Sequence, residues 1–345
     1  MQSHRYGKME SRMNTAHETI HPLPPNILRA LRSGFDAISN HVTIILLPVL
    51  LDLWLWLGPH LQIKTMMADF VAAMKTTSEM GAISGASNTI PIDYSVITEV
   101  VERINLMSFL RSYPVGIPSL VAGILPVDVP AGSPWLVDIA SPVLVILLSL
   151  GLTLLGTLVG SYYFVVVSQA ALDGRVMWKV AWNEWRRVAL NATGLMLALL
   201  VLLLILLVPA SCILSVISMG GIPVSQIAVI VLSGMLLWVL FPLVFTPMGI
   251  FALRLNLIVA VQRSILITRI TLPNTVLFFV VVFITSQGLD FLWRVPQENS
   301  WFTLVGLAGH GFVASSLLAA AMVYYRDADA WAQKIFQGMR RSQSV

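Results

Sequence analysis

Long apolar runs alternate with shorter polar segments along the chain. A helix that crosses a bilayer needs about 20 mostly apolar residues, and six runs reach that length. They cover residues 42–60, 142–170, 192–219, 226–251, 275–293 and 302–325. The pattern therefore predicts six transmembrane helices, some of them long enough to tilt or to project beyond the bilayer.

Three of these runs begin with the same change of composition. In "RVMWKVAWNEWRRVALNATGLMLALLVLLLILLVP" a basic, tryptophan-rich segment turns apolar after an asparagine, and similar changes occur in "RALRSGFDAISNHVTIILLPVLLDLWLWLG" and "RSILITRITLPNTVLFFVVVF". An asparagine oxygen can accept from the backbone amides that have no partner at a helix start. Asn40, Asn191 and Asn274 are therefore predicted N-caps of the first, third and fifth spans.

The segment before each asparagine can form an amphipathic helix. These segments are residues 27–39, 176–190 and 253–271. A basic helix with tryptophan on its apolar side lies in the membrane interface and attracts anionic lipid. The predicted interface residues of the second segment are Trp178, Lys179, Trp182, Trp185, Arg186 and Arg187. We expect three in-plane helices, each meeting its span at a sharp angle.

The order of in-plane helix, span and returning span occurs three times, which is typical of duplicated, pseudo-symmetric bundles. The predicted fold is all-α and integral to the membrane. It has six transmembrane helices arranged as three hairpins, each preceded by a cytoplasmic in-plane amphipathic helix. Residues 25–325 form this domain, with an outer loop at 61–134. A disordered cytoplasmic tail at 1–24, in which Met13 is an alternative start, and a cytoplasmic helix or tail at 326–345 flank it.

Composition supports a membrane protein. Hydrophobic residues make up 57% of the chain and charged residues 11%, with a mean hydropathy of +0.82, whereas soluble proteins carry about 25% charged residues. If the N-terminus is inside, sixteen of the 21 Lys and Arg residues lie on the cytoplasmic side. Cytoplasmic loops are enriched in positive charge. We therefore expect a multi-pass protein of a prokaryotic plasma membrane with both termini in the cytoplasm.

The outer loop combines two helical patterns with a proline-rich segment. Apolar residues at helical spacing predict amphipathic helices at 61–80 and 95–110. The prolines of "SYPVGIPSLVAGILPVDVPAGSPW" exclude a continuous helix after them. Within it, "PVGIPSLVAGILP" is apolar enough to enter the bilayer edge where protein covers it; a surface loop is the alternative. The functional interpretation of this loop is a platform for a membrane-protein partner.

The chain carries none of the common enzyme motifs. Cys212 is the one cysteine and lies in an apolar run, the six histidines form no HExxH, and Walker A, Rossmann and GxSxG patterns are missing. We expect no catalytic residue, no metal site and no nucleic-acid partner. His310 in "GHG" is a candidate tetrapyrrole ligand, but a haem between helices usually has a second ligand at the same depth. No other histidine qualifies, so no cofactor is expected.

Small residues in the second span indicate close packing. Gly151, Gly156 and Gly160 would let another backbone approach this helix. Packing within the chain is one interpretation, and the seam of a homo-oligomer is the other.

Two ionisable residues lie at equal predicted depth. Asp52 and His310 are each about 12–14 Å below the outer ends of the first and sixth spans, at 1.5 Å per residue. A charge in a bilayer is costly unless it is paired, so these two residues are a candidate intramembrane pair. Arg294 is the rival partner for Asp52, and a wet crevice without a partner is the remaining alternative.

Three stretches carry a resemblance to a known family. They are "NEWRRVALNATGLMLALLVLL", "LLPVLLDLWLWLGP" and "MVYYRDADAW". Their order resembles the membrane domain of the glycerophosphoryl diester phosphodiesterase type and related six-span bacterial proteins, over most spans but not the outer loop. The resemblance implies a membrane module. It transfers no active-site residue, because no phosphodiesterase catalytic domain is attached.

These features favour a non-catalytic accessory or scaffold subunit that organises lipid or a partner membrane complex. A transporter or channel built on the pseudo-threefold repeat of hairpins is the alternative. Transporters usually place several polar groups near the midplane, whereas the third and fifth runs are almost purely apolar. An intramembrane enzyme ranks third, because no cluster of acids, bases or metal ligands is evident. The expected partners are membrane lipids, a protein at the outer loop and a second copy of the chain.

Overall fold

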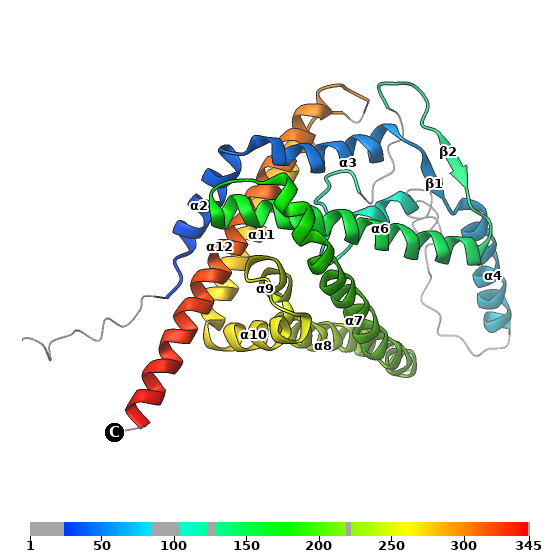
Figure 1. Ribbon diagram of the computed structural model, residues 1–345. Helices are drawn as coiled ribbons and strands as arrows, with labels where there is room; N and C mark the ends of the chain where they lie inside the picture. Colours follow the sequence, from blue (N-terminus) through cyan, green and yellow to red (C-terminus); the bar gives the residue numbers. More distant parts are fainter. Residues whose placement is uncertain (1–23, 84–103, 123–128, 219–221, 298, 344–345) are drawn as a thin grey trace, which may run out of the picture.

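The computed structural model is almost entirely helical (Figure 1). It describes residues 24–83, 104–122, 129–218, 222–297 and 299–343. The helical elements are α2 (Ile27–Ser39), η1 (Val42–Ile45), α3 (Leu46–Leu57), α4 (Lys64–Ile83), η2 (Leu106–Arg111), α6 (Pro142–Ser168), η3 (Gln169–Asp173), α7 (Trp178–Ser218), α8 (Ile222–Leu240), η4 (Phe241–Leu243), α9 (Thr246–Ala252), α10 (Leu257–Ile270), α11 (Leu272–Trp293) and α12 (Thr303–Gln343). The strands β1 (His60–Gln62) and β2 (Leu136–Asp138), which the sequence pattern did not predict, pair in parallel.

Five of the described helices are long and apolar enough to cross a membrane, and α2 with η1–α3 makes a sixth candidate as a bent pair. This confirms the all-α class and agrees with a multi-pass membrane protein. α6 begins and α11 ends at the predicted limits of their spans. The fourth predicted span is divided into α8, η4 and α9, because Pro242 and Pro247 each lack the N–H of a continuous helix.

The three predicted joints behave differently. At the first, α2 meets η1–α3 at 87°, and at the third, α10 ends at Ile270 and α11 begins at Leu272. At the second there is no break, because α7 continues through Asn191 to Ser218. The prediction of a separate in-plane helix in the second unit is therefore wrong. No glycine or proline interrupts α7 before Gly194, so nothing local ends the helix there.

α12 packs against α2, α3, α6, α9, α10 and α11, and α2 lies along it (Figure 1). The buried residues of α2 are Ala30, Gly34 and Ile38 at a spacing of four. A Cβ on Gly34 would lie 2.5 Å from the Ala320 nitrogen and 2.5 Å from the Ser316 oxygen. The two backbones are therefore in contact, and α2 places this apolar face on protein rather than on lipid.

Aromatic rings fill the core beside α12. Phe278 of α11 stacks on Tyr324 with ring centroids 4.3 Å apart, and Phe245 lies 5.9 Å from the same tyrosine ring. The Tyr163 hydroxyl of α6 donates a 2.9 Å hydrogen bond to Ser315 of α12. These side chains are fully buried, so α6 and α11 share one core with α12.

Residues 104–122, a described part of the second half of the outer loop, pack into the fold, and we call them the inserted loop. Val115, Ile117 and Leu120 are buried, and η2 packs against α6. This burial favours the predicted segment that protein covers over the alternative prediction of a surface loop. In the first half, α4 corresponds to the helix expected at 61–80. Of the helix expected at 95–110, only η2 and the two residues before it lie among the described residues, and the predicted tail at 1–24 is described only at Pro24.

Two of the three predicted packing glycines accommodate this inserted loop. A Cβ on Gly156 would lie 2.2 Å from the Leu110 carbonyl oxygen, and one on Gly160 would lie 2.5 Å from the Gly116 Cα. A Cβ on Gly151 would meet no other described part of the chain within 4 Å. Gly156 and Gly160 therefore serve packing within the chain, against the short helix η2 and the turn that follows it.

The hairpin of α7 and α8 extends away from α12 (Figure 1). In the most apolar 18-residue stretch of each hairpin helix no residue is buried, whereas 61% of the residues in that of α12 are. Leu204, Ile205, Ile230 and Trp238 are 54%, 63%, 71% and 77% exposed. The most apolar stretches of the hairpin thus contribute little to the core, whereas the first half of α7 contributes Ala181, Val188, Ala192 and Leu195.

Candidate functional site

A polar cluster, buried at Asp52, Ser119 and His310, joins α3, α11 and α12 to the inserted loop. We call it the loop-side cluster, and it comprises Asp52, Ser119, Leu120, Asp290, Arg294 and His310. Asp52 is fully buried and accepts a hydrogen bond from the Ser119 hydroxyl. The backbone amides of Leu120 and Val121 donate to the same carboxylate at 3.0 and 3.3 Å. The inserted loop therefore supplies the donors that a buried carboxylate needs.

Arg294 holds the same loop from the other side. Its guanidinium donates a 2.9 Å hydrogen bond to the carbonyl oxygen of Leu120, the residue whose amide bonds to Asp52. The rival prediction of a direct contact between Asp52 and Arg294 is thus replaced by a bridge through one peptide unit. The bridge fixes the loop between α3 and the end of α11.

His310 bonds to Asp290 rather than to Asp52. Its Nδ1 lies 2.7 Å from the Asp290 carboxylate. The predicted direct pair of Asp52 and His310 is therefore wrong as drawn. α11 packs beside α12 and brings Asp290 to the histidine, while the inserted loop satisfies Asp52.

The other side of His310 is apolar and closely packed. Its Nε2 and the Trp293 Nε1 are buried and have no hydrogen-bond partner in the part of the chain that the structure describes. A Cβ on Gly309 would lie 2.7 Å from the Trp293 ring, so the indole covers α12 beside the histidine. Within the described residues, no three His, Cys, Asp or Glu side chains are grouped for a metal ion.

The predicted interface residues of α7 divide into two sets. Trp185 points into the fold, where its indole N–H is 2.9 Å from the Leu158 carbonyl and 2.8 Å from the Ser161 hydroxyl of α6. Trp182 stacks on it at 4.7 Å but is 56% exposed. The other exposed residues of the set are Trp178, Lys179, Arg186 and Arg187. Trp185 thus fixes α7 to α6 and leaves an aromatic and basic face outside.

None of the three asparagines caps its own span. Asn40 ends α2 as its C-cap, and Asn274 lies inside α11 after Thr271 in the N-cap position. Asn191 lies within α7, and its Oδ1 accepts a 3.1 Å hydrogen bond from the amide of Leu257, the first residue of α10. The cap prediction is therefore wrong for all three spans, because each helix begins elsewhere. Asn191 caps a different helix.

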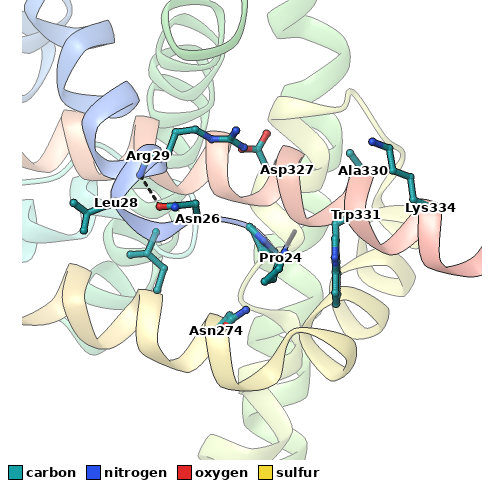
Figure 2. Close-up of a pocket in the computed structure, with 11 residues that line it drawn as sticks. Pro24, Asn26, Leu28, Arg29, Asn274, Asp327, Ala330, Trp331 and Lys334 are labelled. Atoms are coloured by element: carbon teal, nitrogen blue, oxygen red, sulfur yellow. Dashed lines mark hydrogen bonds and ion pairs between the residues drawn. The ribbon is translucent and has the colours of Figure 1, made fainter. Parts of the chain in front are cut away.

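Sequence reasoning missed a groove between the beginning of α2, the beginning of α11 and the last third of α12 (Figure 2). It has a volume of about 830 Å³. Pro24, Arg29, Asn274, Trp331 and Lys334 are among the residues that line it. The only sequence signal was the change from an uncharged apolar run to "RDADAWAQK" after Tyr325.

Comparisons with protein-family models, with curated proteins and with solved structures found no match to this chain.

Proposed function

We propose that this protein is a non-catalytic, multi-pass membrane module, an accessory or scaffold subunit that organises lipid or a partner membrane complex. In this proposal six helical segments cross a prokaryotic plasma membrane, with both termini in the cytoplasm. The exposed apolar hairpin of α7 and α8 is the observation that carries the proposal.

The hairpin offers more apolar surface than the fold itself uses. Its side chains at Ile205, Ile230 and Trp238 are more than half exposed, and α8 packs mainly on α7. Helices in a membrane associate through close van der Waals packing and a few polar contacts rather than through apolar area alone. A hairpin that the other described residues leave uncovered is available to lipid and to the helices of a partner.

The loop-side cluster favours a second candidate, a transporter or channel. It places ionisable side chains from α3, α11 and α12 next to a non-helical segment, as transporter sites do. However, Asp52 and Arg294 are both engaged by the same inserted loop, which favours a fixed structural role.

Site-specific photo-crosslinking in native membranes tests the scaffold proposal. A crosslinker replaces Ile230 or Trp238 on the hairpin, and Phe291 on α11, 79% exposed, serves as the matched control. We expect one recurrent protein adduct from the hairpin positions and none from position 291. Co-purification in mild detergent should then recover the same partner in stoichiometric amount. Lipid adducts alone at all three positions would reject a partner-binding scaffold.

A further inference from the structure

The groove of Figure 2 gathers positive charge around one carboxylate. Asp327 accepts from Arg29 at 2.6 Å and from Arg326 at 3.0 Å. Lys334 lies one to two turns further along α12, is exposed, and makes no ion pair with any residue in the described ranges. In Figure 2 the Arg29 and Lys334 side chains extend toward each other over this part of α12. Arg29, Lys334 and Asp327 are the charged residues among the lining, so the lining carries one excess positive charge, and Arg326 adds a further cation beside Asp327.

The remaining lining is mostly apolar and includes the side-chain amide of Asn274. Pro24, Leu28 and Trp331 line the groove, and Leu28 is 78% exposed. Asn274 lines it from α11, and its side-chain amide forms no hydrogen bond with the residues that the structure describes. The groove thus offers cations, a free amide donor and apolar surface to one ligand.

The position of the groove along α12 matches the headgroup region of a membrane. Residues 303–325 of α12 contain no Asp, Glu, Lys or Arg, and Arg326 is the first charged residue after them. At 1.5 Å per residue, Asp327 to Lys334 lie about 36–46 Å from Thr303. A hydrocarbon core is about 30 Å thick and the whole bilayer about 40–45 Å. When Thr303 lies at the opposite outer edge of the bilayer, charges at this distance lie among the lipid headgroups.

We propose that this groove binds the phosphate group of an anionic lipid headgroup. Lys334 and Arg29 supply the charge that pairs with the phosphate, Asn274 donates a hydrogen bond, and Pro24, Leu28 and Trp331 contact the glycerol and upper acyl carbons. Tryptophan is enriched at this depth of a membrane. The proposal names the lipid that the membrane module would organise, and it rests on the proposed crossing of the membrane by α12 but not on a protein partner.

Native mass spectrometry of the full-length protein in nonionic detergent tests the site. The protein is titrated with short-chain phosphatidylglycerol and, separately, with phosphatidylcholine, which carries the same phosphate but no net charge. We expect at least one phosphatidylglycerol to bind more tightly than phosphatidylcholine. Lys334→Gln should weaken that binding about fivefold, because one basic residue at a membrane surface contributes about that factor.

Two further variants separate the groove from general surface charge. Lys75→Gln removes the same charge from an exposed position of α4, outside the groove and outside the predicted lipid-interface residues, and should change the affinity by about twofold or less. Ala330→Asp adds a negative charge to the exposed groove lining without removing a contact, and it should weaken binding at least as much as Lys334→Gln. Equal effects of Lys334→Gln and Lys75→Gln, or no effect of either groove variant, would overturn the proposal.

Inorganic phosphate distinguishes the two sources of a phosphate ligand. If the lipid is the ligand, millimolar phosphate should leave the bound phosphatidylglycerol in place. Displacement by phosphate would reject the lipid assignment in favour of a soluble phosphate. Neither result depends on the crosslinking at the hairpin, so the lipid-binding proposal and the partner-binding proposal can be rejected independently.

Discussion

α12 and the α7–α8 hairpin are built from different kinds of apolar sequence. α12 carries alanine, glycine and serine over Gly306–Ala321, and its serines at 315 and 316 are fully buried. The hairpin is dominated by leucine, isoleucine and valine, and these side chains are largely exposed. Lipid solvates large apolar side chains as well as a protein interior does, whereas small residues let backbones approach. In this fold, small residues therefore mark the helix surface where backbones meet, whereas high hydropathy alone does not mark a buried helix.

The largest effect expected from this difference is at Gly34. Gly34→Leu would force side-chain atoms into the α12 backbone, where even a Cβ lies 2.5 Å from Ala320 and Ser316. We expect a loss of about 3 kcal/mol of stability, at the upper end for overpacking. Gly234→Leu on α8 is the matched control, because a Cβ there would meet no other described part of the chain within 4 Å. Thermal unfolding in detergent compares them, and equal losses would contradict direct backbone contact between α2 and α12.

The loop-side cluster provides the second test, because it is the most polar part of the core. Asp52→Ala would leave the Ser119 hydroxyl and the amides of Leu120 and Val121 without their acceptor. Buried donors without a partner cost about 1–3 kcal/mol, so we expect a loss near the top of that range. Asp69→Ala on α4 removes an exposed acid and should have almost no effect.

Hydrogen exchange locates the loss caused by Asp52→Ala. Residues 112–122 should exchange faster in the variant, while Tyr163 and its neighbours in α6 keep their protection. Unchanged exchange of the loop would mean that Asp52 does not hold it.

The positions of the helices followed from the sequence, but their partners did not. A bilayer requires helices of a minimum length, so apolar runs located α6, α7 and α11 to within a few residues, apart from the earlier start of α7. The cap at Asn191 could not be recognised, because its partner Leu257 is 66 residues away. Likewise, the donors to Asp52 lie 67 to 69 residues along the chain. Pairing of this kind depends on tertiary packing, which the local pattern does not encode.

A smaller effect is expected where the hairpin joins the core. Asn191 accepts from the Leu257 amide, so Asn191→Ala should remove a helix cap and cost about 1 kcal/mol. Asn183→Ala, at an exposed position of the same helix, is the control and should be nearly neutral. Faster hydrogen exchange at Leu257 in the first variant alone would confirm the cap, and equal behaviour of the two variants would exclude it.

The smallest expected effect is a dependence of stability on pH at His60. This residue begins β1, beyond the end of α3 at Leu57, and it is fully buried. Its Nε2 lies 3.0 Å from the Leu55 carbonyl, so this nitrogen carries the proton of the neutral ring. Its Nδ1 is buried without a partner among the described residues. Protonation would add a second N–H there, and burial accordingly lowers the pKa of His60 below its usual 6.5.

The sign of the pH effect follows from this lowered pKa. The unfolded chain takes up the proton at about pH 6.5, whereas the folded chain takes it up only at lower pH. The stability contributed by neutral His60 is therefore complete above about pH 6.5 and is lost as the pH falls through the lowered pKa. The melting temperature in detergent should be lower at about pH 5 than at about pH 7.5. His60→Gln keeps a donor for Leu55 and removes the titration, so its melting temperature should vary less with pH. An identical pH dependence in both proteins would assign it to other groups.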